Sequence, residues 1–293
     1  MPAENLTHPD LIVTGASGRV GRLLARVWEG TGASVVLQRR GPAALTTSLA
    51  ELHWSPLDGA APLCNWVTDH GVPRAMLVLA GATPGTGRDL ALNRQLAEAC
   101  LNAAREAGIT RLLVASSSAV YGKGRDQPWH ESDKAEPTAP YGRAKLELEA
   151  ACAQARARGL EVCCLRIGNV AGADALLLNA ATDAPLTIDR FADGGGPLRS
   201  YIGPKSLARV VLALARLPDR LPQVLNIAAP RAVGMADLAH AAKLDWRWQP
   251  APKAAIQRLT LDCSALTKLV PLAETESTAA DIVAQWTTCR SAA

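Results

Sequence analysis

The sequence predicts an α/β fold in which helices cover both faces of a doubly wound parallel sheet, followed by a smaller C-terminal lobe. Short apolar runs alternate with helical patterns through the first 170 residues, as in a chain built from consecutive strand–helix–strand units. The candidate strands are apolar on both faces, which is typical of parallel strands buried between two helical layers. A glycine-rich turn at residues 15–21 separates the first apolar run from the first helical pattern.

Six apolar runs are the candidate strands, and the run near Leu52–Ser55 is the weakest of them. They are Leu11–Thr14, Ser34–Gln38, Leu52–Ser55, Ala75–Ala80, Arg111–Ser116 and Leu160–Ile167. The helices predicted between them are Val20–Glu29, Asp89–Ala107 and Tyr141–Ala157. The second helix has the most regular pattern, because its Leu and Ala residues recur along one stripe and Gly108 follows its end.

The pattern changes after about residue 170. Residues 171–203 are irregular and rich in Gly, Asp and Pro. The elements predicted beyond them are the helix Lys205–Arg216, the strand Val224–Ala228 and the helices Met235–Ala242 and Thr278–Thr287. We therefore predict that residues 1–170 form the sheet domain. Residues 171–293 would form mainly a smaller lobe over the carboxyl edge of the sheet, although some of its elements could return to that sheet.

Composition excludes several classes of protein. The 293 residues are 48% apolar and 20% charged, and the net charge of +4 is too small to indicate nucleic-acid binding. The seven cysteines show no CxxC spacing and the five histidines are scattered, so we predict reduced core thiols and no metal site. The first ten residues are polar, and no apolar run is long enough to span a bilayer. We predict a cytoplasmic protein with no membrane or nucleic-acid partner.

The glycine-rich turn, Gly15-Ala-Ser-Gly18-Arg-Val-Gly21, has the spacing and position of a dinucleotide-binding motif. The first glycine permits a tight turn, the second lets the backbone approach a pyrophosphate, and the third lets the helix pack on the strand. The N–H groups at the helix start would face the anion. Three glycines could also simply form a loop, but this context favours a Rossmann domain over residues 1–170, with the substrate bound mainly by residues 171–293.

The end of the second candidate strand bears on the choice of cofactor. An acidic residue there would bind the ribose hydroxyls of NAD, but this chain has Gln38-Arg39-Arg40. An arginine can clamp a 2′-phosphate, and Arg19 in the glycine turn could add a second phosphate contact. The sequence therefore favours NADP over NAD, with solvent-facing arginines as the alternative interpretation.

Tyr141 and Lys145 are four residues apart, so they share one face of a helix. We predict that Tyr141 is a general acid/base whose phenol, with an ordinary pKa near ~10, is made more acidic by the Lys145 ammonium. A serine of the upstream Ser116–Ser118 run would hold the substrate oxygen. Each residue alone could be structural: a helix start, a solvated lysine or a strand terminus. Together, after a dinucleotide motif, they predict hydride chemistry at an alcohol or ketone.

These motifs resemble those of the extended short-chain dehydrogenase/reductases, specifically the NAD-dependent epimerase/dehydratase family. The resemblance also includes Asn93, which opens its helix as in the family. It extends to three further segments, Leu165-Arg-Ile-Gly-Asn169-Val-Ala-Gly172, Leu198-Arg199-Ser-Tyr201-Ile202 and Leu225-Asn226-Ile-Ala. The family's catalytic hydroxyl stands four residues before a tyrosine-glycine pair, which selects Ser117.

The resemblance implies a full set of site residues. The catalytic residues would be Ser117, Tyr141 and Lys145. The cofactor would be bound by Gly15, Ser17, Gly18, Arg19, Val20, Gly21, Arg39, Arg40, Ala80, Gly81, Asn93, Ser116, Lys145 and Ile167. The substrate would be bound by Ser118, Asn169, Arg199 and Tyr201, with Arg199 at a diphosphate.

The chain also departs from the family pattern. The family's dehydratases carry an acidic pair after the catalytic hydroxyl, where this chain has Ser118 and Ala119, which argues against dehydration. Ile167 and Ala171 replace the usual residues near the nicotinamide. A second diphosphate-binding arginine in an Arg-x-Gly-Asp setting is absent from the sequence.

The resemblance implies NAD(P)-dependent hydride transfer at a hydroxyl or keto carbon of a sugar or nucleotide-sugar-like small molecule. One alternative is an NADPH-dependent ketone or aldehyde reductase on a non-nucleotide substrate. Another is a non-catalytic NADP-binding sensor. The family's four-helix pairing implies a homodimer.

Overall fold

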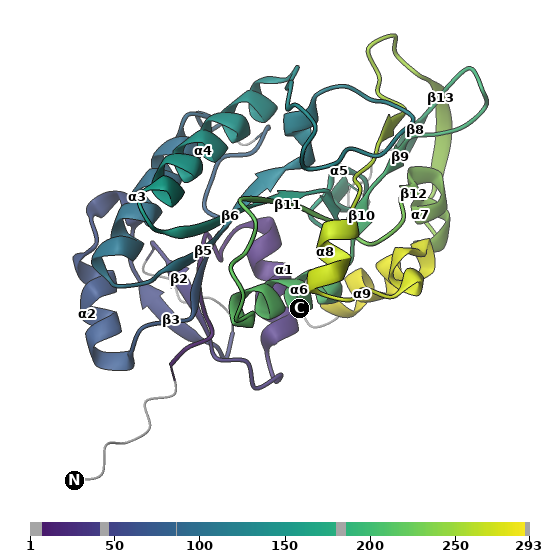
Figure 1. Ribbon diagram of the computed structural model, residues 1–293. Helices are drawn as coiled ribbons and strands as arrows, with labels where there is room; N and C mark the ends of the chain where they lie inside the picture. The colour runs from purple at the N-terminus through teal and green to yellow at the C-terminus, as the bar shows by residue number, and fades with distance from the viewer. Residues whose placement is uncertain (1–7, 42–46, 86, 180–185, 291–293) are drawn as a thin grey trace.

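The computed structural model describes residues 8–41, 47–85, 87–179 and 186–290. Its centre is a seven-stranded sheet with the strand order β11-β6-β5-β4-β1-β2-β3, in which every neighbouring pair is parallel. The order reverses direction at β1, with β2 and β3 on one side and β4, β5, β6 and β11 on the other (Figure 1). This arrangement confirms the doubly wound Rossmann-type sheet.

The strands of the large sheet are short, and all except the edge strand β3 are mostly buried. They are β1 (Leu11–Thr14), β2 (Val35–Arg39), β3 (Ala50–His53), β4 (Ala75–Val78), β5 (Arg111–Ser117), β6 (Glu161–Ile167) and β11 (Val224–Ile227). The helices that flank it are α1 (Arg19–Trp28), α2 (Ala61–His70), α3 (Leu92–Glu106), α4 (Pro140–Ala157) and α6 (Pro204–Arg216). Short 3₁₀ turns occupy Pro56–Asp58, Ser118–Tyr121 and Glu274–Ser277.

Strand residues alternate between two cores, which explains why the strands are apolar on both faces. Leu11 and Val13 of β1 join the core beneath α1 and α6, whereas Ile12 joins the core beneath α2, α3 and α4. Figure 1 shows α3 and α4 side by side on one face of the sheet. The two helical layers fix the carboxyl ends of the strands in a rigid frame, and that edge is where a Rossmann fold binds its ligands.

Most of the remaining elements form a small lobe around a third core. Its sheets pair β7 (Asn169–Val170) with β10 (Tyr201–Ile202), β8 (Leu186–Arg190) with β13 (Trp246–Pro250), and β9 (Leu198–Arg199) with both β12 (Val233–Gly234) and β14 (Arg258–Leu259). Its helices are α5 (Ala175–Asn179), α7 (Met235–Ala241) and α9 (Ala279–Arg290), whereas α8 (Ser264–Leu269) packs through Leu266 on the core of the large sheet beside β11. Residues 180–185, inside the segment expected to be irregular, lie outside the described residues, as does the polar start of the chain before residue 8.

One difference from the sequence prediction has a clear physical reason. The helix α2 was not predicted, because only Leu63 and Val67 of its residues are buried and no apolar stripe marks it. The strand β11 and the helix α6 come after residue 170 and return to the large sheet, as the sequence prediction allowed: β11 pairs with β6 and α6 packs beside α1. Among the described residues, no helix is both long and apolar enough to cross a membrane.

Candidate active site

The glycine turn after β1 leaves no room for side chains where the chain folds back. Gly15 has a φ of +74°, and a Cβ on it would lie 2.5 Å from the Ala80 nitrogen. A Cβ on Gly21 would lie 2.5 Å from the Ala16 carbonyl oxygen. These contacts let the turn sit against the end of β4 and let α1 pack closely on the turn.

The start of α1 is prepared for an anion. Gly18 caps the helix without a side-chain hydrogen bond, and the first turn of α1 contains no acidic residue. The first N–H groups of a helix have no partner within it, and they carry the positive end of the helix dipole. The Gly18 N–H donates to the Gly15 carbonyl at 2.9 Å, so the N–H groups of residues 19–21 are those that a phosphate could reach.

A cavity of about 740 Å³ lies along the carboxyl ends of β1, β2, β4, β5 and β6. Most of the sequence-predicted site residues line it. They are Gly15, Ser17, Gly18, Arg19, Val20, Gly21, Arg39, Arg40, Ala80, Gly81, Asn93, Ser116, Ser117, Tyr141, Lys145, Ile167 and Asn169. Three predicted substrate residues, Ser118, Arg199 and Tyr201, are not among its lining residues.

Ser117 and Tyr141 meet at one end of this cavity. Ser117 ends β5 and Tyr141 lies in the first turn of α4, and the Ser117 side chain lies close enough to the Tyr141 phenol to act to lower its pKa. Ser117 also accepts a hydrogen bond from the Ala119 N–H, at 3.2 Å. A hydroxyl pair held this way can contact a single substrate oxygen from two sides.

Lys145 lies beside this pair but is turned toward the sheet. Its ammonium nitrogen donates a hydrogen bond to the Ala115 carbonyl at 2.8 Å and lies 5.8 Å from the centre of the Tyr141 ring. Burial lowers the pKa of Lys145 to about 8. The ammonium is therefore held between β5 and α4 rather than hydrogen-bonded to the phenol.

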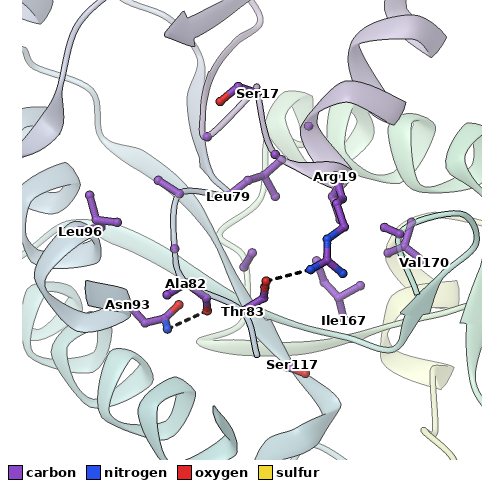
Figure 2. A pocket seen from close by; sticks show the side chains of 18 of the residues that line it. Ser17, Arg19, Leu79, Ala82, Thr83, Asn93, Leu96, Ser117, Ile167 and Val170 are labelled. Atoms are coloured by element: carbon purple, nitrogen blue, oxygen red, sulfur yellow. Dashed lines mark hydrogen bonds between the residues drawn. The ribbon is translucent and has the colours of Figure 1, made fainter. Parts of the chain in front are cut away.

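The acidity of Tyr141 differs from the sequence expectation. Burial raises the pKa of Tyr141 above its ordinary value, against opposing effects of the Ser117 hydrogen bond and the Arg19 charge. The expected net lowering of this pKa is therefore wrong for this arrangement, because burial outweighs the effect of the nearby charges. The Arg19 guanidinium reaches from the start of α1 toward Thr83 and donates to its hydroxyl at 3.3 Å (Figure 2).

Arg39, expected as a phosphate clamp, is engaged within the protein. Its Nε donates to a Glu51 carboxylate oxygen at 2.7 Å, and its Nη1 donates to the Gly41 carbonyl. Arg40 is exposed at the same end of the cavity. Sequence reasoning missed Glu51 because a partner on a neighbouring parallel strand has no fixed spacing from Arg39.

The three predicted substrate residues outside the cavity have structural partners or surroundings. The Arg199 guanidinium donates to the backbone carbonyls of Leu198, Ile256 and Gln257. The Tyr201 hydroxyl donates to Asp174 at 2.8 Å, and Ser118 is buried in the 3₁₀ turn after β5. The structure therefore does not bring Arg199 to the cavity as the expected diphosphate contact, because β14 lies beside β9 and captures its side chain.

Comparison with known proteins places this geometry in a family. The sequence profile of the NAD dependent epimerase/dehydratase family matches residues 11–228, well over half of the chain. The chain belongs to this family. This membership confirms the resemblance drawn from the motifs.

The sequence identity between this chain and individual members of the family is either low or confined to a short segment. A UDP-glucose 4-epimerase of Lacticaseibacillus casei is 40% identical over 74 residues, which span 25% of this chain and only 22% of that relative. The structure is similar to a UDP-glucose-4-epimerase from Stenotrophomonas maltophila with bound NAD and formylated UDP-arabinopyranose, with a TM-score of 0.78, 20% identity and coverage of 98% of this chain and 100% of that one. It is also similar to MoeE5 in complex with UDP-glucose and NAD, with a TM-score of 0.75, 25% identity and coverage of 97% and 100%.

The family's dinucleotide fits the residues present. Asn93, at the start of α3, donates from its amide nitrogen to the carbonyls of Ala82 and Leu90, both at 3.0 Å (Figure 2). Its Oδ1 atom is buried without a hydrogen-bond partner among the described residues. A Cβ on Gly81 would lie 2.5 Å from that oxygen. An acceptor in the cavity wall and the uncapped α1 start match a ligand that carries both N–H or O–H donors and phosphates.

Several cavity residues were missed by sequence reasoning. Gln38 accepts a hydrogen bond from the Gly15 N–H at 3.0 Å and donates to the Trp54 carbonyl, so it ties the glycine turn to β3. Asp174 lines the opposite end, where burial raises its pKa although the Tyr201 hydroxyl and three backbone N–H groups hydrogen-bond to it. The sequence does mark the position of Asp174, because an Asp directly before a helical run is a typical N-cap residue.

Proposed function

We propose that this family member is an NAD(P)-dependent enzyme that transfers hydride at a hydroxyl or keto carbon of a sugar or nucleotide-sugar-like small molecule. The observation that carries the proposal is that Ser117 and Tyr141 act on one another in the wall of the same cavity that the glycine turn lines. A protein that only bound the dinucleotide would need the turn but not a positioned phenol and hydroxyl.

The residues have complementary roles in carbonyl reduction. The nicotinamide, when bound, supplies the hydride. Tyr141 is protonated at neutral pH because burial raises its pKa, so it can donate a proton to the substrate oxygen. Ser117 donates a hydrogen bond to the same oxygen as negative charge develops on it. In the oxidation direction, Tyr141 takes the proton of the hydroxyl instead.

Lys145 acts through its charge. Its ammonium stabilises negative charge on the phenol once the proton has left, although burial keeps its own pKa near about 8. The pKa of Lys145 sets the sign of the pH dependence: the ammonium is intact below about pH 8 and is lost as the pH rises through that value. Reduction should therefore weaken on the alkaline side.

We propose NADP as the preferred cofactor. Arg19, Arg22, Arg39, Arg40 and Arg88 line the cavity, and Asp174, at the far end from β2, is the acidic residue among the described lining residues. The Gln38 acceptor at the end of β2 is already bonded to Gly15. This end of the cavity therefore favours a phosphate over a pair of ribose hydroxyls.

The cofactor preference predicts a specific loss. Replacing Arg40, the exposed arginine at this end of the cavity, by alanine should weaken NADPH binding by about 10- to 100-fold while changing NADH binding less than about threefold, since the lost contacts are charge-assisted hydrogen bonds to the extra phosphate. Fluorescence titration of both cofactors measures it. Arg105→Ala, an exposed arginine of α3, is the control. Equal losses for NADPH and NADH would contradict the preference.

The proposed activity covers two different reactions, epimerisation and net reduction. Family membership favours epimerisation, in which the hydride returns to the same carbon. The burial of Arg199 against backbone carbonyls instead favours a reductase that acts on a non-nucleotide ketone or aldehyde, because the expected diphosphate contact is engaged elsewhere. We disfavour dehydration because Ser118 and Ala119 provide no acidic pair. We further propose a homodimer paired through α3 and α4, as the family resemblance implies.

An assay of cofactor balance tests the function. Keto and hydroxy sugars, their nucleotide derivatives and simple ketones are incubated with NADPH or NADP, while absorbance follows the cofactor and chromatography follows the substrate. One NADPH consumed for each product identifies a reductase, whereas an epimer formed without net consumption identifies an epimerase. Tight NADPH binding without turnover of any of these compounds would contradict the proposed activity and favour a sensor.

A further inference from the structure

The helix that carries Tyr141 and Lys145 presents a third polar side chain to the sheet. Glu149 lies one turn beyond Lys145 on α4 and is buried. One carboxylate oxygen accepts hydrogen bonds from the Ser116 hydroxyl at 2.6 Å and from Arg166 Nε at 3.0 Å. The other accepts from Arg166 Nη2 at 2.8 Å. Glu149 thus joins α4 to the strand ends that form the site.

The Glu149–Arg166 ion pair belongs to a layer of polar side chains that crosses three strands. Ser116, Arg166 and Asn226 are register partners on β5, β6 and β11. Arg166 donates to the Tyr121 hydroxyl at 3.1 Å, and that hydroxyl donates to Asn226 at 2.7 Å. The layer is therefore continuous from Ser116, next to Ser117, to Asn226.

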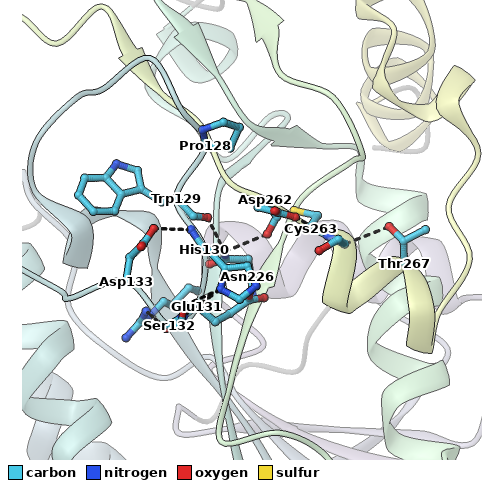
Figure 3. Close-up of polar contacts among 12 residues, drawn as sticks. Pro128, Trp129, His130, Glu131, Ser132, Asp133, Asn226, Asp262, Cys263 and Thr267 are labelled. Atoms are coloured by element: carbon cyan, nitrogen blue, oxygen red, sulfur yellow. Dashed lines mark hydrogen bonds and ion pairs between the residues drawn. The ribbon is translucent and has the colours of Figure 1, made fainter.

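Asn226 closes the far end of this layer. Its amide nitrogen donates to the carbonyls of Trp129 and Asp262, and its backbone N–H donates to Glu131 at 2.9 Å (Figure 3). The side chains of Arg166 and Glu149 are only 6% and 8% exposed. Nearly every polar group of this layer is satisfied inside the protein, which gives the carboxylate a single fixed position.

Stability alone does not explain such a pair. Removing two charges from water costs about as much free energy as their attraction returns, so apolar residues of similar size are often equally stable. The Glu149 carboxylate also holds Ser116, the residue next to Ser117. This contact fixes the spacing between β5 and α4. That spacing sets the distance between the Ser117 and Tyr141 hydroxyls.

The carboxylate also acts on Lys145. The titratable groups around this ammonium are Glu149 and Cys152 from α4, Cys164 from β6 and the Tyr141 phenol. Hydrogen bonding to Cys152 and burial raise the pKa of Cys164 well above its ordinary value, so this thiol stays neutral in the physiological range. Burial lowers the pKa of Lys145, and the surroundings contributed by Cys152, Cys164 and Glu149 oppose this lowering; Glu149 is the carboxylate among them.

We propose that Glu149, held by Arg166, is a positioning residue of the site: it fixes Ser116, and with it Ser117, against α4 and places a negative charge one helical turn from Lys145. This role rests on the proposed function, in which Ser117, Tyr141 and Lys145 handle the substrate proton. Glu149 itself touches neither substrate nor cofactor, since it is not a lining residue of the cavity.

Glu149→Gln tests this role, because it keeps the shape of the side chain and removes the charge. We expect kcat to fall by about 10- to 100-fold, as for a small misplacement of reacting groups, with a smaller change in KM. The pKa of Lys145 should fall by roughly one unit, which moves the alkaline loss of activity to lower pH. NMR titration of ¹³C-labelled lysine side chains, with the Lys145 signal assigned from Lys145→Met, measures this shift without any turnover.

Glu147→Gln is the matched control, because Glu147 lies on the exposed face of the same helix. If Glu149→Gln matches this control in kcat and in the Lys145 midpoint, the proposal is wrong. A loss of thermal stability with an unchanged Lys145 midpoint and unchanged kcat would reduce Glu149 to a structural role and would also overturn it. If wild-type protein turns over no substrate, the proposed function fails, while the NMR titration still decides whether Glu149 controls the Lys145 charge.

A second variant covers the case in which Glu149→Gln does not fold. The double substitution Glu149→Gln with Arg166→Met leaves neither charge unpaired. It should fold and still show the lower kcat and the lower Lys145 midpoint. Wild-type values of both in this variant would overturn the proposal.

Discussion

Tyr141→Phe is expected to lower kcat by about 10²- to 10⁴-fold, the usual contribution of a positioned general acid or base. The substitution removes the phenolic hydroxyl that lies beside Ser117 and leaves the ring in place. NADPH affinity should change by less than about threefold, because the ring and the glycine turn remain. Single-turnover kinetics for the chemical step and fluorescence titration for the cofactor measure the two effects separately.

Tyr121→Phe is a useful comparison, since Tyr121 is a buried tyrosine that lies among Arg166 and Asn226 rather than in the cavity wall. It should lower stability more than it lowers the rate of the chemical step. Unchanged turnover in Tyr141→Phe would contradict the catalytic assignment and leave a dinucleotide-binding protein.

Arg166→Met is expected to lower the free energy of unfolding by about 3–5 kcal/mol, the range measured when one partner of a buried ion pair is removed. The cost arises because the Glu149 carboxylate loses its two charge-assisted hydrogen bonds from Arg166 and stays buried. Chemical denaturation followed by circular dichroism measures the change.

The double substitution described above should recover much of this loss, because it removes the unpaired charge along with its partner. Arg158→Met, at an exposed position just after α4, should change stability by less than about 0.5 kcal/mol. If Arg166→Met is as stable as this control, the buried pair carries no energetic coupling and the argument for a fixed β5–α4 spacing loses its basis.

The fold was largely predictable because its strands are buried on both faces. The runs Leu11–Thr14 and Arg111–Ser116 coincide with β1 and with most of β5, since continuous apolar residues bounded by turns specify parallel strands. The helix predicted from Asp89 begins only at Leu92, because the Asp89 carboxylate accepts a hydrogen bond from the Ala91 N–H and forms a turn first. Most strands of the small sheets in the C-terminal lobe were not predicted, because β7, β9, β10, β12 and β14 have only two residues each and carry no periodic signal. The five-residue strands β8 and β13 are mostly not buried and were also missed.

Much of the site was also predictable, because its motifs are local. The glycine turn and the Tyr141–Lys145 pair need only short-range spacing, and both line the cavity. What depends on distant partners was not predictable. Arg39 on β2 pairs with Glu51 on the neighbouring strand β3, and Arg199 donates hydrogen bonds to the carbonyls of Ile256 and Gln257. No spacing in the sequence indicates either contact.

The predicted lowering of the Tyr141 pKa was wrong because this pKa also depends on packing by distant parts of the chain. A four-residue spacing correctly put Tyr141 and Lys145 on one helix face, but the depth of burial decides their pKa values. Burial raises the pKa of Tyr141 and lowers that of Lys145 to about 8. Only the packed structure reveals that Glu149 opposes this effect at Lys145.

A crystal structure of the protein with NADP and a keto substrate tests the central claim most directly. We expect a single carbonyl oxygen within hydrogen-bond distance of both the Ser117 and Tyr141 hydroxyls. The nicotinamide should face the carbon of that carbonyl, and the pyrophosphate should lie at the start of α1. A cofactor bound elsewhere, or a substrate oxygen that touches neither hydroxyl, would contradict it.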